Sequence, residues 1–131
     1  CVFSCHPYYD TEVYFGEKGD LSYLSVEQFN KEIEKMFLNI YPIIKTSDYN
    51  KNCFYPVIFT VGTYRLREGK GIIDMDYIFQ KYAYKSGFIL YDKIITENNS
   101  PALGFTINRN FQKGFVGKTH ETTLVFHKIK I

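Results

Sequence analysis

Segments with the helical spacing of apolar residues alternate with strand-like segments, and this alternation limits the possible folds more than any other feature of the chain. Residues 1–5, 54–61 and 88–95 are rich in β-branched and aromatic residues, as strands are. Strands separated by helices favour an α/β fold with a mostly parallel sheet and right-handed crossovers. We expect residues 1–5 to form a buried strand.

The two predicted helices have identifiable ends. Ser25 is a candidate N-cap, and Gln28 completes a capping box three residues later. This helix ends near Pro42, and its apolar face comprises Val26, Phe29, Ile33, Phe37 and Ile40. A polar run, residues 62–71, leads into the second helix, which ends where Gly87 can serve as a C-terminal cap. Its apolar face comprises Ile73, Ile78, Phe79 and Tyr82.

The C-terminal part of the chain contains a long loop, residues 96–119, and a last strand, residues 122–131. No helix separates this strand from the one before it, so we expect an antiparallel pair at one edge of the sheet. In the strand at 54–61, Pro56 predicts that the strand either starts late or bends at that residue.

Length and composition limit the class of protein. The chain has 131 residues, of which 45% are apolar and 24 are Phe or Tyr. These numbers suit one domain with an aromatic core. No apolar run approaches the roughly 20 residues of a membrane span, and no secretory signal is visible. The three cysteines fit neither a metal site nor a disulfide framework, so we expect an intracellular protein in which Cys5 and Cys53 are small core residues.

Charge is distributed unevenly along the chain. Residues 103–131 contain five basic residues and one acidic residue, a balance of +4, whereas the first 102 residues have a balance of −2. A basic C-terminal part is compatible with a polyanionic partner such as nucleic acid.

The first strand ends in the segment Ser-Cys-His-Pro-Tyr-Tyr-Asp, residues 4–10. Ligands of open α/β sheets bind outside the carboxyl ends of the strands. Pro7 stiffens the turn there, so that backbone carbonyl groups can point into a cleft. A tyrosine beside such carbonyls can stack on a planar group while the carbonyls accept hydrogen bonds from an exocyclic amine. An enzyme that acts on an extruded nucleobase needs this arrangement.

This segment resembles the catalytic motif of S-adenosylmethionine-dependent DNA amino-methyltransferases, whose pattern is [Asp/Asn/Ser]-Pro-Pro-[Tyr/Phe/Trp]. It is similar to a phage- and prophage-associated branch that reads Ser-Cys-Pro-Pro-Tyr-Tyr-Asp. Residues 117–121, Gly-Lys-Thr-His-Glu, resemble the lead-in to the final strand of the same branch. The resemblance implies the C-terminal half of a Rossmann-like methyltransferase fold with an antiparallel last strand. Residues 1–131 would form a single, partial catalytic domain.

The resemblance also implies roles for the motif residues. Cys5 and the carbonyl group of His6 would contact the target amino group, and Tyr8 would stack on a flipped adenine or cytosine. Pro7 would keep the turn rigid. The methyl group passes directly to the amine in this family, so Cys5 is not expected to act as a nucleophile.

DNA is the partner that the resemblance implies, and methylation of this kind also occurs in restriction–modification systems. Tyr9 and Asp10 are predicted to contact the substrate. Arg109, Lys113 and Lys118 are predicted to contact phosphates, which would position the DNA without specifying a sequence.

Two departures from the family pattern accompany the resemblance. His6 replaces the first proline of the motif, which preserves the carbonyl group but reduces rigidity and adds a titratable ring. The Phe-x-Gly-x-Gly signature of the S-adenosylmethionine site is absent from the 131 residues. In this branch the signature precedes the catalytic motif, so we expect residues upstream of Cys1 to complete the cofactor site. Without that half, or a dimer partner, the chain should aggregate or dimerise, because its sheet would expose an apolar edge.

Two other functions stay open beside DNA methylation. The chain could be a non-catalytic, methyltransferase-like module that binds nucleic acid or a partner protein. It could also be an unrelated nucleotide-binding α/β domain.

Overall fold

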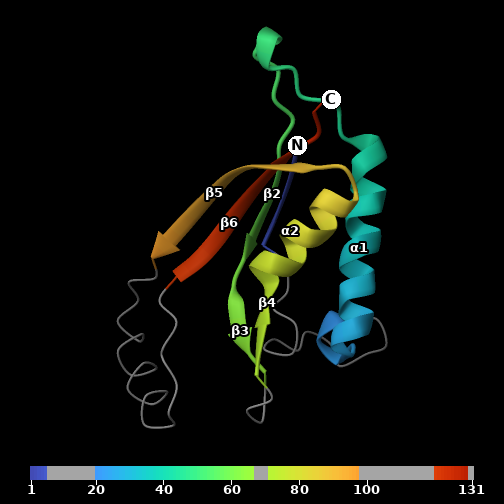
Figure 1. Ribbon diagram of the computed structural model, residues 1–131, viewed down its shortest axis with the longest axis vertical. Coiled ribbons are helices and arrows are strands. Elements are labelled where there is room, and N and C mark those ends of the chain that lie inside the picture. Colours follow the sequence, from blue (N-terminus) through green and yellow to red (C-terminus); the bar gives the residue numbers. More distant parts are fainter. Residues whose placement is uncertain (6–19, 67–70, 98–119, 130–131) are drawn as a thin grey trace.

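The computed structural model describes residues 1–5, 20–66, 71–97 and 120–129. A four-stranded sheet packs against two α-helices, and a two-stranded hairpin continues from one end of the sheet (Figure 1). In chain order the elements are β1 (Val2–Cys5), η2 (Leu21–Tyr23), α1 (Val26–Ile43), η3 (Tyr49–Lys51), β2 (Val57–Val61), β3 (Thr63–Arg65), β4 (Ile72–Asp74), α2 (Met75–Lys85), β5 (Ile89–Glu97) and β6 (His120–His127). Within these ranges neither α-helix is long and apolar enough to cross a membrane.

The strands of the main sheet lie in the order β1-β2-β6-β5. β1 and β2 are parallel, and β6 runs antiparallel to both β2 and β5. The predicted antiparallel last strand and the antiparallel pair at one edge are therefore confirmed, and the fold is mixed α/β. The sheet was predicted to be mostly parallel, but β1 and β2 are the one parallel pair of neighbours in the described sheet, because β6 lies between β2 and β5. The last strand is the inner member of that pair, since it lies between β2 and β5. Leu124 and Phe126 are accordingly fully buried, whereas most of β5 is exposed.

Local sequence signals set the start of α1 as expected. Ser25 Oγ accepts a hydrogen bond from the Gln28 amide at 3.2 Å, and the Gln28 side chain accepts one from the Ser25 amide at 3.0 Å. This reciprocal pair satisfies two amides that the first turn leaves without helical partners. Phe29, Ile33 and Phe37 form the buried face of the helix.

The end of α1 is one residue later than Pro42, because the helix includes this proline in its last turn and ends at Ile43. A proline there costs one helical hydrogen bond. Lys128, just beyond β6, caps the carbonyl groups at the C-terminal end of this helix. Its Nζ donates to the carbonyl oxygens of Tyr41 (3.0 Å) and Ile44 (3.4 Å), where a cation also complements the helix dipole.

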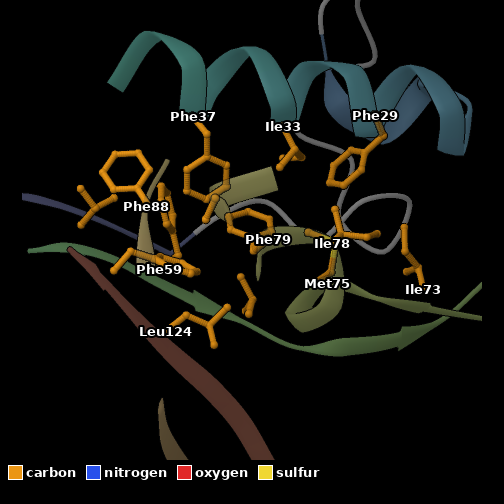
Figure 2. Close-up of a cluster of buried hydrophobic side chains, with 14 of the residues drawn as sticks. Phe29, Ile33, Phe37, Phe59, Ile73, Met75, Ile78, Phe79, Phe88 and Leu124 are labelled. Carbon is orange, nitrogen blue, oxygen red and sulfur yellow. The ribbon is translucent and has the colours of Figure 1, made fainter. Parts of the chain in front are cut away.

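The core is built around the ring of Phe37. This ring makes edge-to-face contacts with four other phenylalanines at centroid distances of 5.5–6.0 Å, namely Phe59, Phe79, Phe88 and Phe126. They come from β2, α2, the residue before β5, and β6, so one side chain of α1 contacts elements from most of the chain. Figure 2 shows Phe37 pointing from α1 toward the sheet, near Phe59, Phe79 and Phe88. The predicted aromatic core is confirmed.

The hairpin β3–β4 was not expected from the polar run at residues 62–71. Gly71 has φ +107°, a conformation that other residues rarely adopt, and its carbonyl accepts from the Leu66 amide at 3.0 Å. This bond helps to close the hairpin. Ile73 consequently lies in β4, and its predicted place on the second helix was wrong. Asp74 is the N-cap of α2 and accepts from the Tyr77 amide at 3.2 Å.

The prediction for Gly87 is confirmed, because this residue has φ +94° directly after the C-cap of α2. A Cβ atom at this position would also lie 3.0 Å from the ring of Tyr41. The glycine is thus required both by backbone conformation and by the close approach of α1.

Two expectations about burial were wrong. β1 was predicted to be a buried strand, but it is an edge strand of the described sheet, and Phe3 is 69% exposed. Cys5 and Cys53 are exposed rather than packed in the core. β1 is exposed because of its position in the sheet. Its one partner among the described strands is β2, and Phe3 aligns with Ile58 on the face opposite the helices.

The sheet face opposite the helices carries an aromatic cluster at its amino end. We call this surface, which includes Phe3, Ile58, Val125 and His127, the helix-free face. The His127 ring stacks on Tyr91 at 4.4 Å, and its Nδ1 is 2.9 Å from the hydroxyl oxygen of Tyr49. His127 is only 3% exposed, and this burial lowers the pKa of its ring below the ordinary value.

Replacing Phe37 by Ala should remove the contacts that join α1 to the sheet. We expect the free energy of unfolding to fall by about 3–5 kcal/mol, the usual cost of such a cavity. Denaturant unfolding followed by circular dichroism measures this change. Leu38→Ala is the matched control, because Leu38 is the next residue of α1 and is 54% exposed. Equal losses in both variants would contradict the central role of Phe37.

Folding stability should decrease when the pH falls below about 6.5, the ordinary pKa of histidine. The unfolded chain then takes up a proton on His127 that the folded chain resists, so the free energy of unfolding falls until the folded pKa is passed. Thermal unfolding at about pH 7.5 and about pH 5.5 measures the effect. His127→Gln should reduce this pH dependence of Tm, whereas His120→Gln, at the exposed start of β6, should preserve it. Identical slopes in the wild type and His127→Gln would refute the assignment.

Candidate active site

β1 carries the start of the predicted motif to the carboxyl edge of the sheet. Cys5 is the last residue of β1 and aligns with Thr60 near the end of β2. Because β1 and β2 are parallel, both strands end at the same edge, where open α/β sheets bind ligands. Cys5 therefore lies at the end of the first strand, as the sequence predicted. It is exposed to solvent and forms no disulfide.

Two threonines extend a polar row from Cys5 across the helix-free face. Thr60 aligns with Cys5 on one side and with Thr123 of β6 on the other. The hydroxyl oxygens of the two threonines are 3.0 Å apart, which is a hydrogen bond. This bond ties β2 to β6 beside the candidate site. Sequence reasoning missed the pair because its members are 63 residues apart and neither belongs to a motif.

The hairpin β3–β4 borders the same edge. β2 ends at Val61 and β3 begins at Thr63, so the hairpin continues from the carboxyl end of β2, as Figure 1 shows. Thr63 donates a hydrogen bond from Oγ1 to Asp74 Oδ1 at 3.3 Å, which joins the base of the hairpin. Arg65 lies on β3 and is exposed. The hairpin thus adds a basic side chain beyond the carboxyl end of β2.

The other predicted site residues lie outside the described residues. These are His6, Pro7, Tyr8, Tyr9, Asp10, Arg109, Lys113 and Lys118. Their roles stay predictions, which depend on the position of Cys5 and on the sequence motifs.

The described residues do not form a metal site, since they contain no group of three or more His, Cys, Asp or Glu side chains arranged to hold an ion. They also do not fit S-adenosylmethionine. Nucleotide-like cofactors bind at a glycine-rich turn between a strand and the start of a helix. The described glycines with positive φ, Gly71 and Gly87, lie instead in the β3–β4 hairpin and after the end of α2.

A separate hollow of about 240 Å³ lies at the amino end of the sheet. Its lining is mostly apolar and comprises Phe54, Pro56, Ile58, Tyr91, Asp92, Val125 and His127. Cys5 is at the opposite end of the strands, so this hollow is not part of the candidate active site.

Comparison with solved structures finds a similar fold in a protein from Thermus thermophilus that is described as a candidate DNA modification methylase. The TM-score is 0.56 and the sequence identity 18%, and the match covers 80% of this chain and 38% of that protein. No protein-family model and no curated protein matches the sequence. This chain therefore has a methyltransferase-like fold, and it corresponds to well under half the length of the methylase that it resembles.

Proposed function

We propose that this chain is the catalytic part of a DNA amino-methyltransferase that modifies the exocyclic amine of adenine or cytosine. The observation that carries the proposal is the position of the motif: Cys5 ends a strand at the carboxyl edge of a methyltransferase-like sheet. The residues that follow at once include Pro7 and Tyr8, a proline-stiffened turn and an aromatic ring of the kind that can stack on an extruded base.

The geometry of the strand end supports a binding role for the backbone. An exocyclic amine donates hydrogen bonds, so its site needs acceptors that are not already paired within a sheet. The chain leaves β1 after Cys5 and reaches Pro7, which cannot donate a ladder hydrogen bond. We assign the acceptor role to the carbonyl of His6 and assign the stacking role to Tyr8. Cys5 lines the position of the amine.

S-adenosylmethionine is the proposed methyl donor, and it would supply an electrophilic methyl group. The described residues do not form its site, so the proposal places the glycine-rich turn outside them. This chain would hold the target base, with the amine nitrogen directed at the methyl group. In the proposed step the S–CH3 bond of the cofactor would break as the N–C bond forms, S-adenosylhomocysteine would leave, and the methylated amine would lose one proton to water, with no covalent bond to the protein.

Contacts to DNA outside the target base are assigned to basic residues. Arg109, Lys113 and Lys118 belong to the segment between β5 and β6, whose two strands begin or end at the carboxyl edge. Arg65 on the hairpin adds a cation near the same edge. Such cations bind phosphates of any sequence, so they would position the duplex without selecting a site.

A non-catalytic module is the second candidate. It is favoured by the lack of a cofactor turn in the described residues and by His6 in place of the usual proline. In this case the same edge would bind nucleic acid or a partner protein without chemistry.

Calorimetric titration of S-adenosylmethionine into the 131-residue chain tests where the cofactor site lies. We expect no heat of binding at micromolar concentrations, because the described residues contain no strand-to-helix glycine turn. Micromolar binding would show that the pocket forms within this chain or across a dimer, and it would overturn the placement of the site outside these residues.

Replacement of Tyr8 by Ala tests the catalytic proposal. The assay uses a protein that joins this chain to a cofactor-binding half. Stacking on a base is worth about 1–3 kcal/mol, so methyl transfer from labelled S-adenosylmethionine to unmethylated DNA should fall roughly 5- to 150-fold in kcat/KM. Tyr8→Phe keeps the ring and should retain most of the activity. Tyr23→Ala is the control, because Tyr23 is exposed and outside the motif. DNA binding that depends on Tyr8 with no methylation under any condition would support the non-catalytic module.

A further inference from the structure

β5 presents a long unpaired edge on the described sheet. β6 pairs with it on one side, and no other described strand pairs with it. The strand has nine residues, about 30 Å in length, and its last seven are exposed. Three of the exposed side chains are large and apolar: Tyr91 (54%), Ile94 (50%) and Ile95 (65%). An exposed, apolar edge of this length favours pairing with a further strand.

We propose that the outer edge of β5 pairs antiparallel with β5 of a second copy of this chain, with Ile95 of one copy facing Ile95 of the other on a twofold axis. This contact joins two four-stranded sheets into one continuous sheet. Because each copy uses the same surface, the contact closes on itself and yields a dimer rather than a fibre.

Charge and side-chain direction favour this register over the registers shifted by one or two residues. With the two Ile95 residues opposed, Lys93 of each copy faces Glu97 of the other, which gives two pairs of opposite charge. A register centred between Ile94 and Ile95 is excluded, because it would oppose residues whose side chains lie on opposite faces of the sheet. A register centred on Ile94 would place Lys93 opposite Ile95 and form no charge pair.

The surroundings of Lys93 suit this arrangement. Its Nζ lies 2.6 Å from Asp76 Oδ2 on α2, which shows that Lys93 points to the helix side of the sheet. Ile95 and Glu97 follow at spacings of two and share that side. A row of alternating charge would therefore run from Asp76 through Lys93 to Glu97 of the second copy, beside the two apolar Ile95 side chains.

The start of β5 is unsuited to pairing and limits the contact to the second part of the strand. The register with β6 shifts between Leu90 and Asp92, a bulge that bends the edge. Pairing is thus confined to residues 93–97, and an interface of this length gives a dimer that depends on protein concentration.

Sedimentation velocity over a range of concentrations tests the proposal. The wild-type chain should show a monomer–dimer equilibrium. Ile95→Lys places two lysines opposite one another on the axis and should raise the dissociation constant roughly tenfold or more. Ile43→Lys is the matched control, because Ile43 is 74% exposed at the end of α1 and its replacement should leave the equilibrium unchanged. Circular dichroism verifies that both variants fold.

A second pair of variants tests the register. Glu97→Lys places like charges opposite Lys93 twice and should weaken the dimer more than the neutral Glu97→Gln does. A monomeric wild type at all concentrations would overturn the proposal. So would a dimer that Ile95→Lys and Glu97→Lys leave intact, or one that is lost on Phe3→Lys, since that result would place the contact at β1.

Discussion

Packing around the Phe37 ring holds the described elements in their arrangement. This ring contacts phenylalanines from β2, α2, the start of β5, and β6, which are elements spread over 68 residues from Phe59 to Phe126. Edge-to-face pairs of this kind add to the free energy of burying each ring. They hold α1 against one face of the sheet, and Phe59 and Phe126 are buried beneath it.

This packing also decides where chemistry can take place. The helix-covered face is filled with large apolar side chains, which leaves the carboxyl edge and the helix-free face for polar groups. Cys5, Thr60 and Thr123 lie in register across three strands at that edge, and the threonine hydroxyls bond to each other. The segment that follows Cys5 thus continues from a strand that is paired in register with β2, which is the support that the proposed catalytic role would need.

The two outer strands of the described sheet differ in a way that bears on assembly. β1 is short and exposes Phe3, whereas β5 is long and combines exposed isoleucines with a Lys and a Glu spaced four residues apart. A contact through β5 leaves the end of β1, and thus the candidate active site, free for a substrate. The proposed dimer and the proposed reaction are accordingly compatible, because they use different strands.

Features that depend on neighbouring residues could be predicted from the amino-acid sequence alone. The capping box of Ser25 and Gln28 and the glycine after α2 were both predicted, because each depends on interactions within a few residues. Pro56 predicted either a late start or a bend of its strand, and the structure shows the late start, at Val57. The motif from residue 4 to residue 10 was likewise readable as a unit, and its first part lies at the expected strand end. Tertiary packing was needed to establish that the last strand lies between β2 and β5, that residues 63–65 and 72–74 pair as a hairpin, that β1 is a half-exposed edge strand, and that the cysteines are exposed. Strand order and burial depend on contacts between residues far apart in the chain, such as Thr60 and Thr123, and local patterns of apolar residues contain no information about which distant strand will become the neighbour.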